Sequence, residues 1–171
     1  MTGGDDVAAA RAALRAAERT AALSPAGIVT TWFGVGLLPG PRGTWGTFAA
    51  VPFAWAIQHF GGPWALFAAA GIATAIGIRA SGLYAARLGV KDPSSAVIDE
   101  VAGIFLTLSF TPASTLGWGI GVLVFRILDI WKPWPARVFD RDLPGGLGIV
   151  LDDVMSGFYG LLLMGLLGRW L

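Results

Sequence analysis

The chain has 171 residues, of which 55% are hydrophobic and 13% are charged; an average soluble protein carries about 25% charged residues. The mean hydropathy is +0.68 and the formal net charge is +1. These values exclude a disordered chain, a coiled coil and a basic nucleic-acid binder, because one net positive charge cannot hold a polyphosphate by electrostatics. A membrane protein or an unusually apolar helical bundle remains, and we favour the membrane.

Residues 5–23 are rich in alanine and carry Arg11, Arg15 and Arg19 at intervals of four. This spacing predicts a helix with three cations along one stripe, which either faces solvent or contacts anionic lipid headgroups. The segment lacks the continuous apolar stretch of a signal peptide, so we do not expect cleavage, and its arginines favour a cytoplasmic N-terminus. We treat residues 1–23 separately from a single helical domain over residues 24–171.

Five apolar runs follow, and each predicts a short helix. They cover residues 44–60, 63–78, 98–110, 116–131 and 154–171. None reaches the roughly 20 residues that cross a bilayer comfortably, so we expect a thin or partly embedded bundle. Because the alternation of a strand is absent and Gly and Pro stand between the runs, the sequence predicts an all-α bundle, membrane-embedded or membrane-associated.

The charged residues beyond the N-terminal helix are unevenly placed. Apart from Arg169, they fall at Arg42, in residues 79–100 and in residues 126–153. Two apolar runs separate each stretch from the next, and an even number of crossings returns the chain to the same side. All three stretches are therefore predicted to meet on the side of the N-terminus, as a polar cap that is typical of an active site at a membrane surface.

Few residue types can supply the chemistry. The chain has no cysteine, and His59 is its single histidine. This composition excludes disulfides, thiolate metal sites, cysteine nucleophiles and any mechanism that needs two imidazoles. We interpret His59 as structural or interfacial, because it lies near the end of the first apolar run, away from the charges. Carboxylates, arginine, lysine and hydroxyls remain.

Five carboxylates lie at the edges of apolar runs, where an ionised group is costly unless it is paired or bound to a metal. They are Asp99, Glu100, Asp129, Asp152 and Asp153. Oxygen ligands without a thiol suit Mg²⁺. The alternative is helix capping, because the pairs at 99–100 and 152–153 would each open a helix. Capping does not explain Asp129, which follows an apolar run.

Two cations lie beside these carboxylates. Arg126 is three residues before Asp129, hence on the same helix face, and Lys132 precedes a proline at which the helix should end. Arg126 and Asp129 could form an ion pair. Alternatively, Arg126 and Lys132 could bind phosphate oxygens beside a metal. Residues 137–142, which include Arg141, have the spacing of a self-neutralising surface loop.

Two glycine-rich segments could contact phosphate. Residues 36–47 form a Gly/Pro loop that runs into a helix, where backbone N–H groups and the hydroxyls of Thr44 and Thr47 could donate. A tight turn explains this loop equally well, and it is not a Walker A loop. Residues 145–148 give the same kind of signal, with a flexible connector as the alternative.

The order of these blocks resembles a known family. Residues 125–135, 139–141, 145–149 and 152–153, together with the loop at 36–47 and the acidic pair at 99–100, closely resemble the bacterial phosphatidylglycerophosphatase A family. The resemblance covers about residues 34–160. One departure is Arg42-Gly43-Thr44, where that family has Pro-Gly-Thr.

The resemblance implies a Mg²⁺-dependent phosphomonoesterase of the bacterial inner membrane, which converts phosphatidylglycerophosphate to phosphatidylglycerol. The five carboxylates would share one or two Mg²⁺ ions. The phosphate would be bound by Arg126, Lys132, Thr44, Thr47 and Arg141. Two alternatives stay open: a phosphatase of the same family that acts on another phospholipid or an isoprenoid phosphate, and a small membrane transporter or scaffold. A CDP-alcohol phosphotransferase is disfavoured because its Asp-Gly-x-x-Ala-Arg block is missing.

Overall fold

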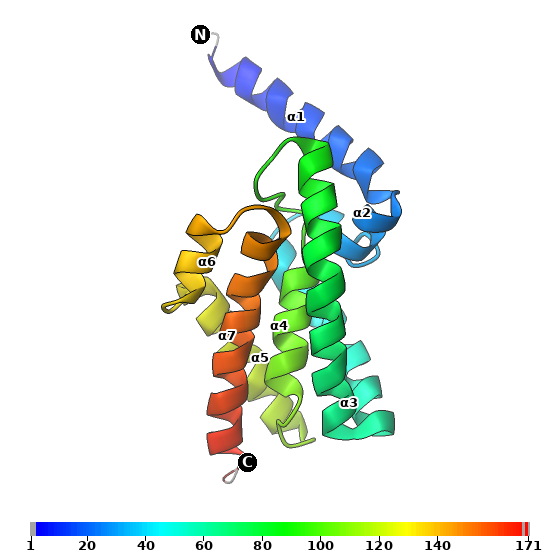
Figure 1. The fold of residues 1–171 in the computed structure, drawn as a ribbon. Coiled ribbons are helices and arrows are strands. Elements are labelled where there is room, and N and C mark those ends of the chain that lie inside the picture. The colour runs from blue at the N-terminus through cyan, green and yellow to red at the C-terminus, as the bar shows by residue number, and fades with distance from the viewer. Residues whose placement is uncertain (1–2, 169, 171) are drawn as a thin grey trace.

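The computed structural model describes residues 3–168 and 170, and within these it contains helices and no strand. The helices are α1 (Gly3–Ala22), α2 (Pro25–Thr30), the 3-10 helix η1 (Val35–Leu37), α3 (Arg42–Leu88), α4 (Ile98–Leu108), α5 (Thr115–Trp131), α6 (Ala136–Asp142) and α7 (Gly145–Leu167). The predicted all-α bundle is confirmed (Figure 1).

α3 consists of two antiparallel arms. The backbone leaves the helical region at Gly62, where φ is 80° and ψ is 178°. Glycine adopts this conformation without steric cost, and Pro63, which follows, has no N–H to continue the helical hydrogen bonds. The reversal predicted at residues 61–62 is confirmed. The second arm continues to Leu88, however, whereas the predicted helix ended at residue 78.

α4 is the centre of the bundle. It packs against both α3 and α7, and α5 covers it from a further side (Figure 1). Its buried residues are Ile98, Val101, Ala102, Gly103, Ile104, Phe105, Thr107 and Leu108. Since most of this short helix is buried by its neighbours, its amino end is held rigidly inside the fold.

α4 and α7 touch backbone to backbone. A Cβ atom on Gly157 would lie 2.4 Å from the carbonyl oxygen of Gly103, and one on Gly103 would lie 2.7 Å from the carbonyl oxygen of Asp153. The Thr107 hydroxyl donates across the same contact to the Gly157 oxygen at 3.2 Å. Small residues permit this approach, as they do between helices in membranes.

α7 begins nine residues before the predicted start at residue 154 and is 23 residues long. The glycines at 145–148 lie in its first turn, so the alternative of a flexible connector there is wrong. A Cβ atom on Gly146 would lie 1.8 Å from the carbonyl oxygen of Ile78, which shows that this turn packs directly on α3. The expectation that every run is too short to cross a membrane is also wrong for α7.

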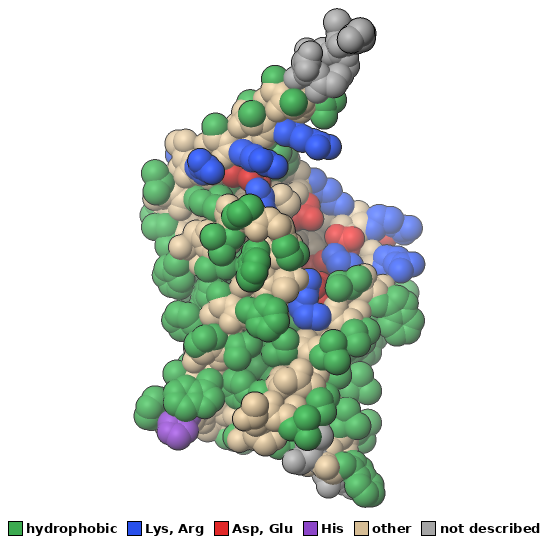
Figure 2. Space-filling view, turned by 180° about the vertical axis from the view of Figure 1, so that it is seen from behind, with side chains coloured by type: hydrophobic (Ala, Val, Ile, Leu, Met, Phe, Trp, Pro, Cys, Tyr) green, Lys and Arg blue, Asp and Glu red, His purple; other side chains and the backbone are tan. Residues whose placement is uncertain are grey.

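The outer surface is divided between charged and apolar side chains. Figure 2 shows the charged side chains gathered towards one end and hydrophobic side chains over the rest, with His59 at the opposite end. His59 stacks on Trp55 with the ring centroids 4.9 Å apart. α3 and α7 are long and apolar enough to span a membrane. The polar cap therefore lies on one side, as the number of apolar runs between the charged stretches predicts.

α1 extends away from the bundle and is fastened by one buried carboxylate. Glu18, which is 3% exposed, accepts hydrogen bonds from Arg42 at 3.1 Å and from the Ser95 hydroxyl at 3.0 Å. Ser95 also lies 2.9 Å from the Tyr84 hydroxyl. Arg11, Arg15 and Arg19 remain exposed. The helix predicted over residues 5–23 is thus present, with its arginine stripe open to the surroundings.

The glycine contact between α4 and α7 can be tested by adding one methyl group. Gly157→Ala should lower the melting temperature of the detergent-solubilised protein by several degrees, since overpacking costs about 1–3 kcal/mol. Gly165→Ala is the matched control in the same helix, because a Cβ atom there meets nothing within 4 Å. Equal melting temperatures for the two variants would contradict the contact.

Candidate active site

An acidic pocket of about 160 Å³ opens within the polar cap. Its walls contain seven carboxylates and two lysines, namely Asp92, Asp99, Glu100, Asp129, Asp140, Asp152, Asp153, Lys91 and Lys132. All five carboxylates selected from the sequence are among them. The structure therefore brings together residues that lie up to 54 positions apart along the chain, from Asp99 to Asp153.

Three helices carry the five predicted carboxylates. Asp99 and Glu100 are in the first turn of α4, and Asp129 is near the end of α5. Asp152 and Asp153 lie within α7, more than a full turn after its start at Gly145. The capping alternative is therefore compatible with the pair in α4 and wrong for the pair in α7.

Asp99, Glu100 and Asp153 are placed to share a cation. Each offers a carboxylate oxygen, and the three oxygens lie within 4.8 Å of one another. Asp99 accepts a hydrogen bond from the Glu100 backbone N–H at 3.0 Å, while Glu100 Oε2 is buried without a hydrogen-bond partner. Oxygen donors of this kind fit Mg²⁺, and an unpaired buried carboxylate oxygen is a group that a cation would satisfy.

The electrostatics of this cluster disfavour three negative charges. Burial, together with the charges of Asp99 and Asp129, raises the pKa of Glu100 well above its usual value. Burial also raises the pKa of Asp99, although the hydrogen bonds from Glu100 act in the opposite direction. A bound divalent cation would reverse this balance, because it favours the ionised carboxylates.

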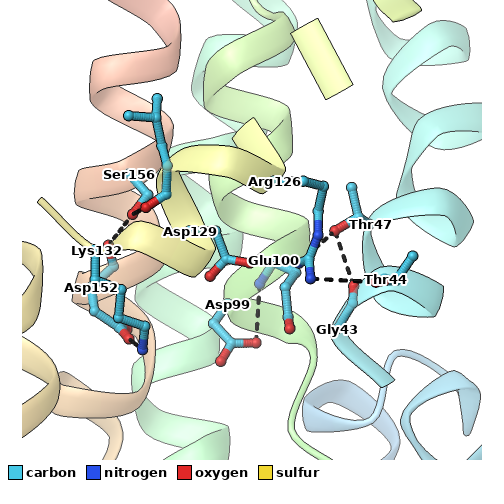
Figure 3. A network of polar contacts seen from close by, with 11 residues as sticks. Gly43, Thr44, Thr47, Asp99, Glu100, Arg126, Asp129, Lys132, Asp152 and Ser156 are labelled. Carbon is cyan, nitrogen blue, oxygen red and sulfur yellow. Dashed lines mark hydrogen bonds and ion pairs between the residues drawn. The ribbon is translucent and has the colours of Figure 1, made fainter. Parts of the chain in front are cut away.

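Lys132 bridges the far side of the pocket. It forms an ion pair with Asp152 (Figure 3). A second ion pair joins Lys132 to Asp140 at 3.3 Å. Burial acts to lower the pKa of Lys132, but the neighbouring Asp152 outweighs it, and the pKa is raised above its usual value. Lys132 ends α5 in a left-handed conformation with φ 47°, which costs a non-glycine residue on the order of 1–3 kcal/mol. Lys132 is therefore a permanent cation held at some cost to the backbone.

Arg126 lies on the opposite side, towards α3 (Figure 3). Its guanidinium donates to Asp129 Oδ2 at 2.5 Å and to the hydroxyls of Thr44 and Thr47 at 3.4 Å. The predicted ion pair with Asp129 is present. The Thr47 hydroxyl donates to the Gly43 carbonyl oxygen, so Thr47 is a support for Arg126 at the start of α3.

Gly43 lets α3 approach the carboxylate cluster. A Cβ atom at this position would lie 2.0 Å from Glu100 Oε1 and 3.4 Å from Arg126 Nη1. The loop at 36–47 was interpreted from the sequence as a phosphate cradle or a tight turn. It also has a third effect: because Gly43 has no side chain, the Glu100 carboxylate can lie directly against the backbone there.

The structure does not bring Arg141 into the pocket. Its guanidinium bonds to Asp142, and its side chain is 77% exposed. Three further charged residues line the pocket that were not selected from the sequence: Lys91 and Asp92, in the loop before α4, and Asp140, in α6. They were missed because the selection considered only charges at the edge of an apolar run, and these three lie away from one. Their place in the charged stretches at 79–100 and 126–153 is the signal that could have included them.

The close approach at Gly43 yields a prediction. Gly43→Ala should displace Glu100 and weaken Mg²⁺ binding about 10- to 100-fold, as changes next to metal ligands do. Isothermal titration of the detergent-solubilised protein with MgCl₂ would measure the affinity. Gly71→Ala is the control, because a Cβ atom there meets nothing within 4 Å. An unchanged affinity in Gly43→Ala would show that Glu100 is not a ligand.

The raised pKa of Glu100 predicts a pH effect on stability. A carboxyl group with a higher pKa in the folded than in the unfolded state binds protons more tightly when folded, so its contribution to stability decreases as pH rises above about 4.5. In EDTA the melting temperature should therefore fall between pH 5 and pH 8. Glu100→Gln should reduce this fall and melt above the unsubstituted protein at pH 8.

The control for this measurement is Asp142→Asn. Asp142 is paired with Arg141, which lowers its pKa, and it lies outside the acidic pocket. This variant should gain no stability at pH 8. If Glu100→Gln melts no higher than the unsubstituted protein at pH 8 in EDTA, charge repulsion in the cluster does not limit stability.

Known proteins resemble this chain over most of its length. A sequence model of the family described as phosphatidylglycerophosphatase A matches residues 28–168. Phosphatidylglycerophosphatase A of Escherichia coli strain K12 is 40% identical over 136 residues, which is 78% of either chain. The Haemophilus influenzae protein of the same name is 29% identical over 155 residues, 90% of this chain and 95% of the relative.

A third relative carries a different name. A Bacteroides thetaiotaomicron protein with the provisional name phosphatidylinositol-3-phosphatase is 31% identical over 151 residues, 84% of this chain and 92% of the relative. No solved structure matches. Since the family match spans most of the chain and includes every helix that forms the acidic pocket, the chain belongs to the phosphatidylglycerophosphatase A family.

Proposed function

We propose that this chain hydrolyses the terminal phosphomonoester of phosphatidylglycerophosphate, giving phosphatidylglycerol and inorganic phosphate, with Mg²⁺ as cofactor. One observation carries the proposal. In a chain of this family, Asp99, Glu100 and Asp153 offer clustered carboxylate oxygens inside a pocket that also contains Lys132, with Arg126 at its side. Hard oxygen ligands beside fixed cations are the arrangement that a metal-assisted phosphatase requires.

The metal would be held by Asp99, Glu100 and Asp153. When bound, Mg²⁺ supplies Lewis-acid polarisation of the phosphoryl group and neutralises charge on it. Asp129 has a different part, because its Oδ2 accepts the hydrogen bond that orients Arg126. The other predicted carboxylate, Asp152, is paired with Lys132, and its Oδ1 is buried without a hydrogen-bond partner.

These residues suggest how the chain would act on phosphate. Lys132 and Arg126 would exchange part of their contacts with carboxylates for the phosphate oxygens and so fix the phosphoryl group. Asp152 would accept a proton from a water that attacks phosphorus in line with the departing glycerol oxygen. The phosphorus–oxygen bond to glycerol breaks, and the glycerol oxygen takes up a proton.

We place the enzyme in the bacterial inner membrane with the polar cap on the cytoplasmic side. Exposed apolar side chains surround the body of the bundle, including Phe60, Trp64, Leu123 and Ile127. Arginines of α1 lie on the same side as the acidic pocket, and positive charge near spans favours the cytoplasm. A lipid phosphate at the interface would then reach the acidic pocket while its acyl chains stay among the apolar helices.

A second candidate substrate is another phospholipid monoester. The name of the Bacteroides thetaiotaomicron relative favours it, because that name specifies a phosphorylated inositol lipid. Lys132 and Arg126 would contact the phosphate group itself, which both kinds of lipid carry.

The first test is phosphate release by the purified protein from phosphatidylglycerophosphate, with Mg²⁺ and with excess EDTA. Turnover should need Mg²⁺ and return when Mg²⁺ is restored. Phosphatidic acid, phosphatidylinositol 3-phosphate and isoprenyl phosphates form the comparison panel, and phosphatidylglycerophosphate should have the highest kcat/KM. No release from any lipid by folded protein would overturn the proposal.

The second test replaces single carboxylates by amides. Asp153→Asn and Asp129→Asn should each lower kcat by about 100-fold or more, since removing one fixed electrostatic contact of an active site has this effect. Circular dichroism should show that both variants keep their helical content. Asp142→Asn, outside the acidic pocket, should keep full activity. Near-normal turnover by Asp153→Asn would refute the metal site. Near-normal turnover by Asp129→Asn would show that the contact between Asp129 and Arg126 is not needed for phosphate binding.

A further inference from the structure

An apolar groove of about 560 Å³ adjoins the acidic pocket on the outside of the bundle. Phe48 and Val51 of the first α3 arm form one wall, and Gly119 and Val122 of α5 form the other. Arg126 and Thr44 also line the groove, towards the polar cap. Arg126 thus lines the groove while its guanidinium donates to Asp129 of the acidic pocket.

The groove exists because α3 and α5 do not pack directly against each other along their length. Both helices pack against α4, and α5 also packs against α7. The hydrogen bonds from Arg126 to Thr44 and Thr47, at 3.4 Å, join α5 to α3 at the polar end. Along α5 the wall stays open at Gly119, where a Cβ atom would meet nothing within 4 Å.

The groove follows α5 from Trp118 to Ile130, which are the first and last α5 residues that line it. Between these two residues the helix rises about 18 Å at 1.5 Å per residue. This length is comparable to one leaflet of a hydrocarbon core about 30 Å thick. The groove therefore extends about as far as one acyl chain.

We propose that this groove binds an acyl chain of the lipid substrate and thereby directs the lipid's phosphate groups past Arg126 into the acidic pocket. The inference rests on the proposed lipid phosphatase function. An acyl chain is the occupant because the walls are apolar, the length is that of one leaflet and a guanidinium lies where the anionic headgroup would begin. Lipid tails are as apolar as the walls, so the groove contributes orientation more than hydrophobic affinity.

The test fills the groove. Gly119→Leu places a side chain in this space, because a Cβ atom at Gly119 meets nothing within 4 Å. Its kcat/KM for phosphatidylglycerophosphate in mixed micelles should fall at least tenfold. Gly71→Leu is the matched control: a helical glycine of α3 that is exposed and equally open, and that lies outside the groove. It should behave like the unsubstituted protein.

A second measurement does not depend on turnover. Phosphatidylglycerophosphate with a photoreactive diazirine midway along one acyl chain should crosslink, in EDTA, to groove residues such as Val51 and Val122. Gly119→Leu should reduce these crosslinks at least fivefold, and Gly71→Leu should not. Crosslinks spread evenly over the apolar surface, or equal kcat/KM in the two leucine variants, would overturn the proposal that the groove binds an acyl chain.

The two proposals fail differently. If the unsubstituted protein releases no phosphate, the proposed function fails. If it is active and Gly119→Leu is equally active, the acyl-chain groove alone fails.

Discussion

The backbone contact between Gly103 and Gly157 is the constraint on which the acidic pocket depends. Each glycine lies four residues after a carboxylate, Asp99 in α4 and Asp153 in α7, so the contact is one helical turn from the carboxylate cluster. With no side chain between the two backbones, the first turn of α4 and the middle of α7 are held close together. Like charges would otherwise favour a wider separation.

The rest of the fold supplies what this arrangement needs. α4 is buried between α3 and α7, so it cannot move away from either without opening the core. Gly146 brings the start of α7 against α3, and Gly43 brings the start of α3 against Glu100. Arg126 and Lys132 then pair with Asp129 and Asp152, the two predicted carboxylates outside the cluster of Asp99, Glu100 and Asp153. Three glycine contacts and two ion pairs thus position one cluster.

Much of this could be predicted from the sequence, because pairs of apolar runs separate the charged stretches and so return each of them to the same side. The reversal at Gly62, the polar cap and the meeting of five carboxylates follow from that pattern. The spacing of three residues between Arg126 and Asp129 placed both on one helix face, where they pair. The family was recognisable from its ordered blocks, and the family match confirms it.

Other features depend on tertiary contacts that no local pattern reports. The glycines at 145–148 indicate a connector by composition, yet they begin α7 because their missing side chains fit against Ile78 and Leu143. For the same reason Asp152 and Asp153 lie inside a helix and do not cap it. Arg141 was selected from its place in a family block, whereas its neighbour Asp142 holds it at the surface. Lys91 and Asp92 line the pocket because of the path of the loop between α3 and α4, which no pattern in the sequence reports.

The excess of carboxylates over lysines in the acidic pocket, seven against two, has a kinetic consequence for the proposed enzyme. An anionic headgroup that approaches the bare pocket meets net negative charge and is repelled. In the proposed enzyme the cation would therefore enter the acidic pocket before the lipid's phosphate does, while the apolar groove stays open to the acyl chain with or without the cation. A chelator would then act as an inhibitor that no concentration of lipid can overcome, because the phosphate has no favourable site until the cation is in place.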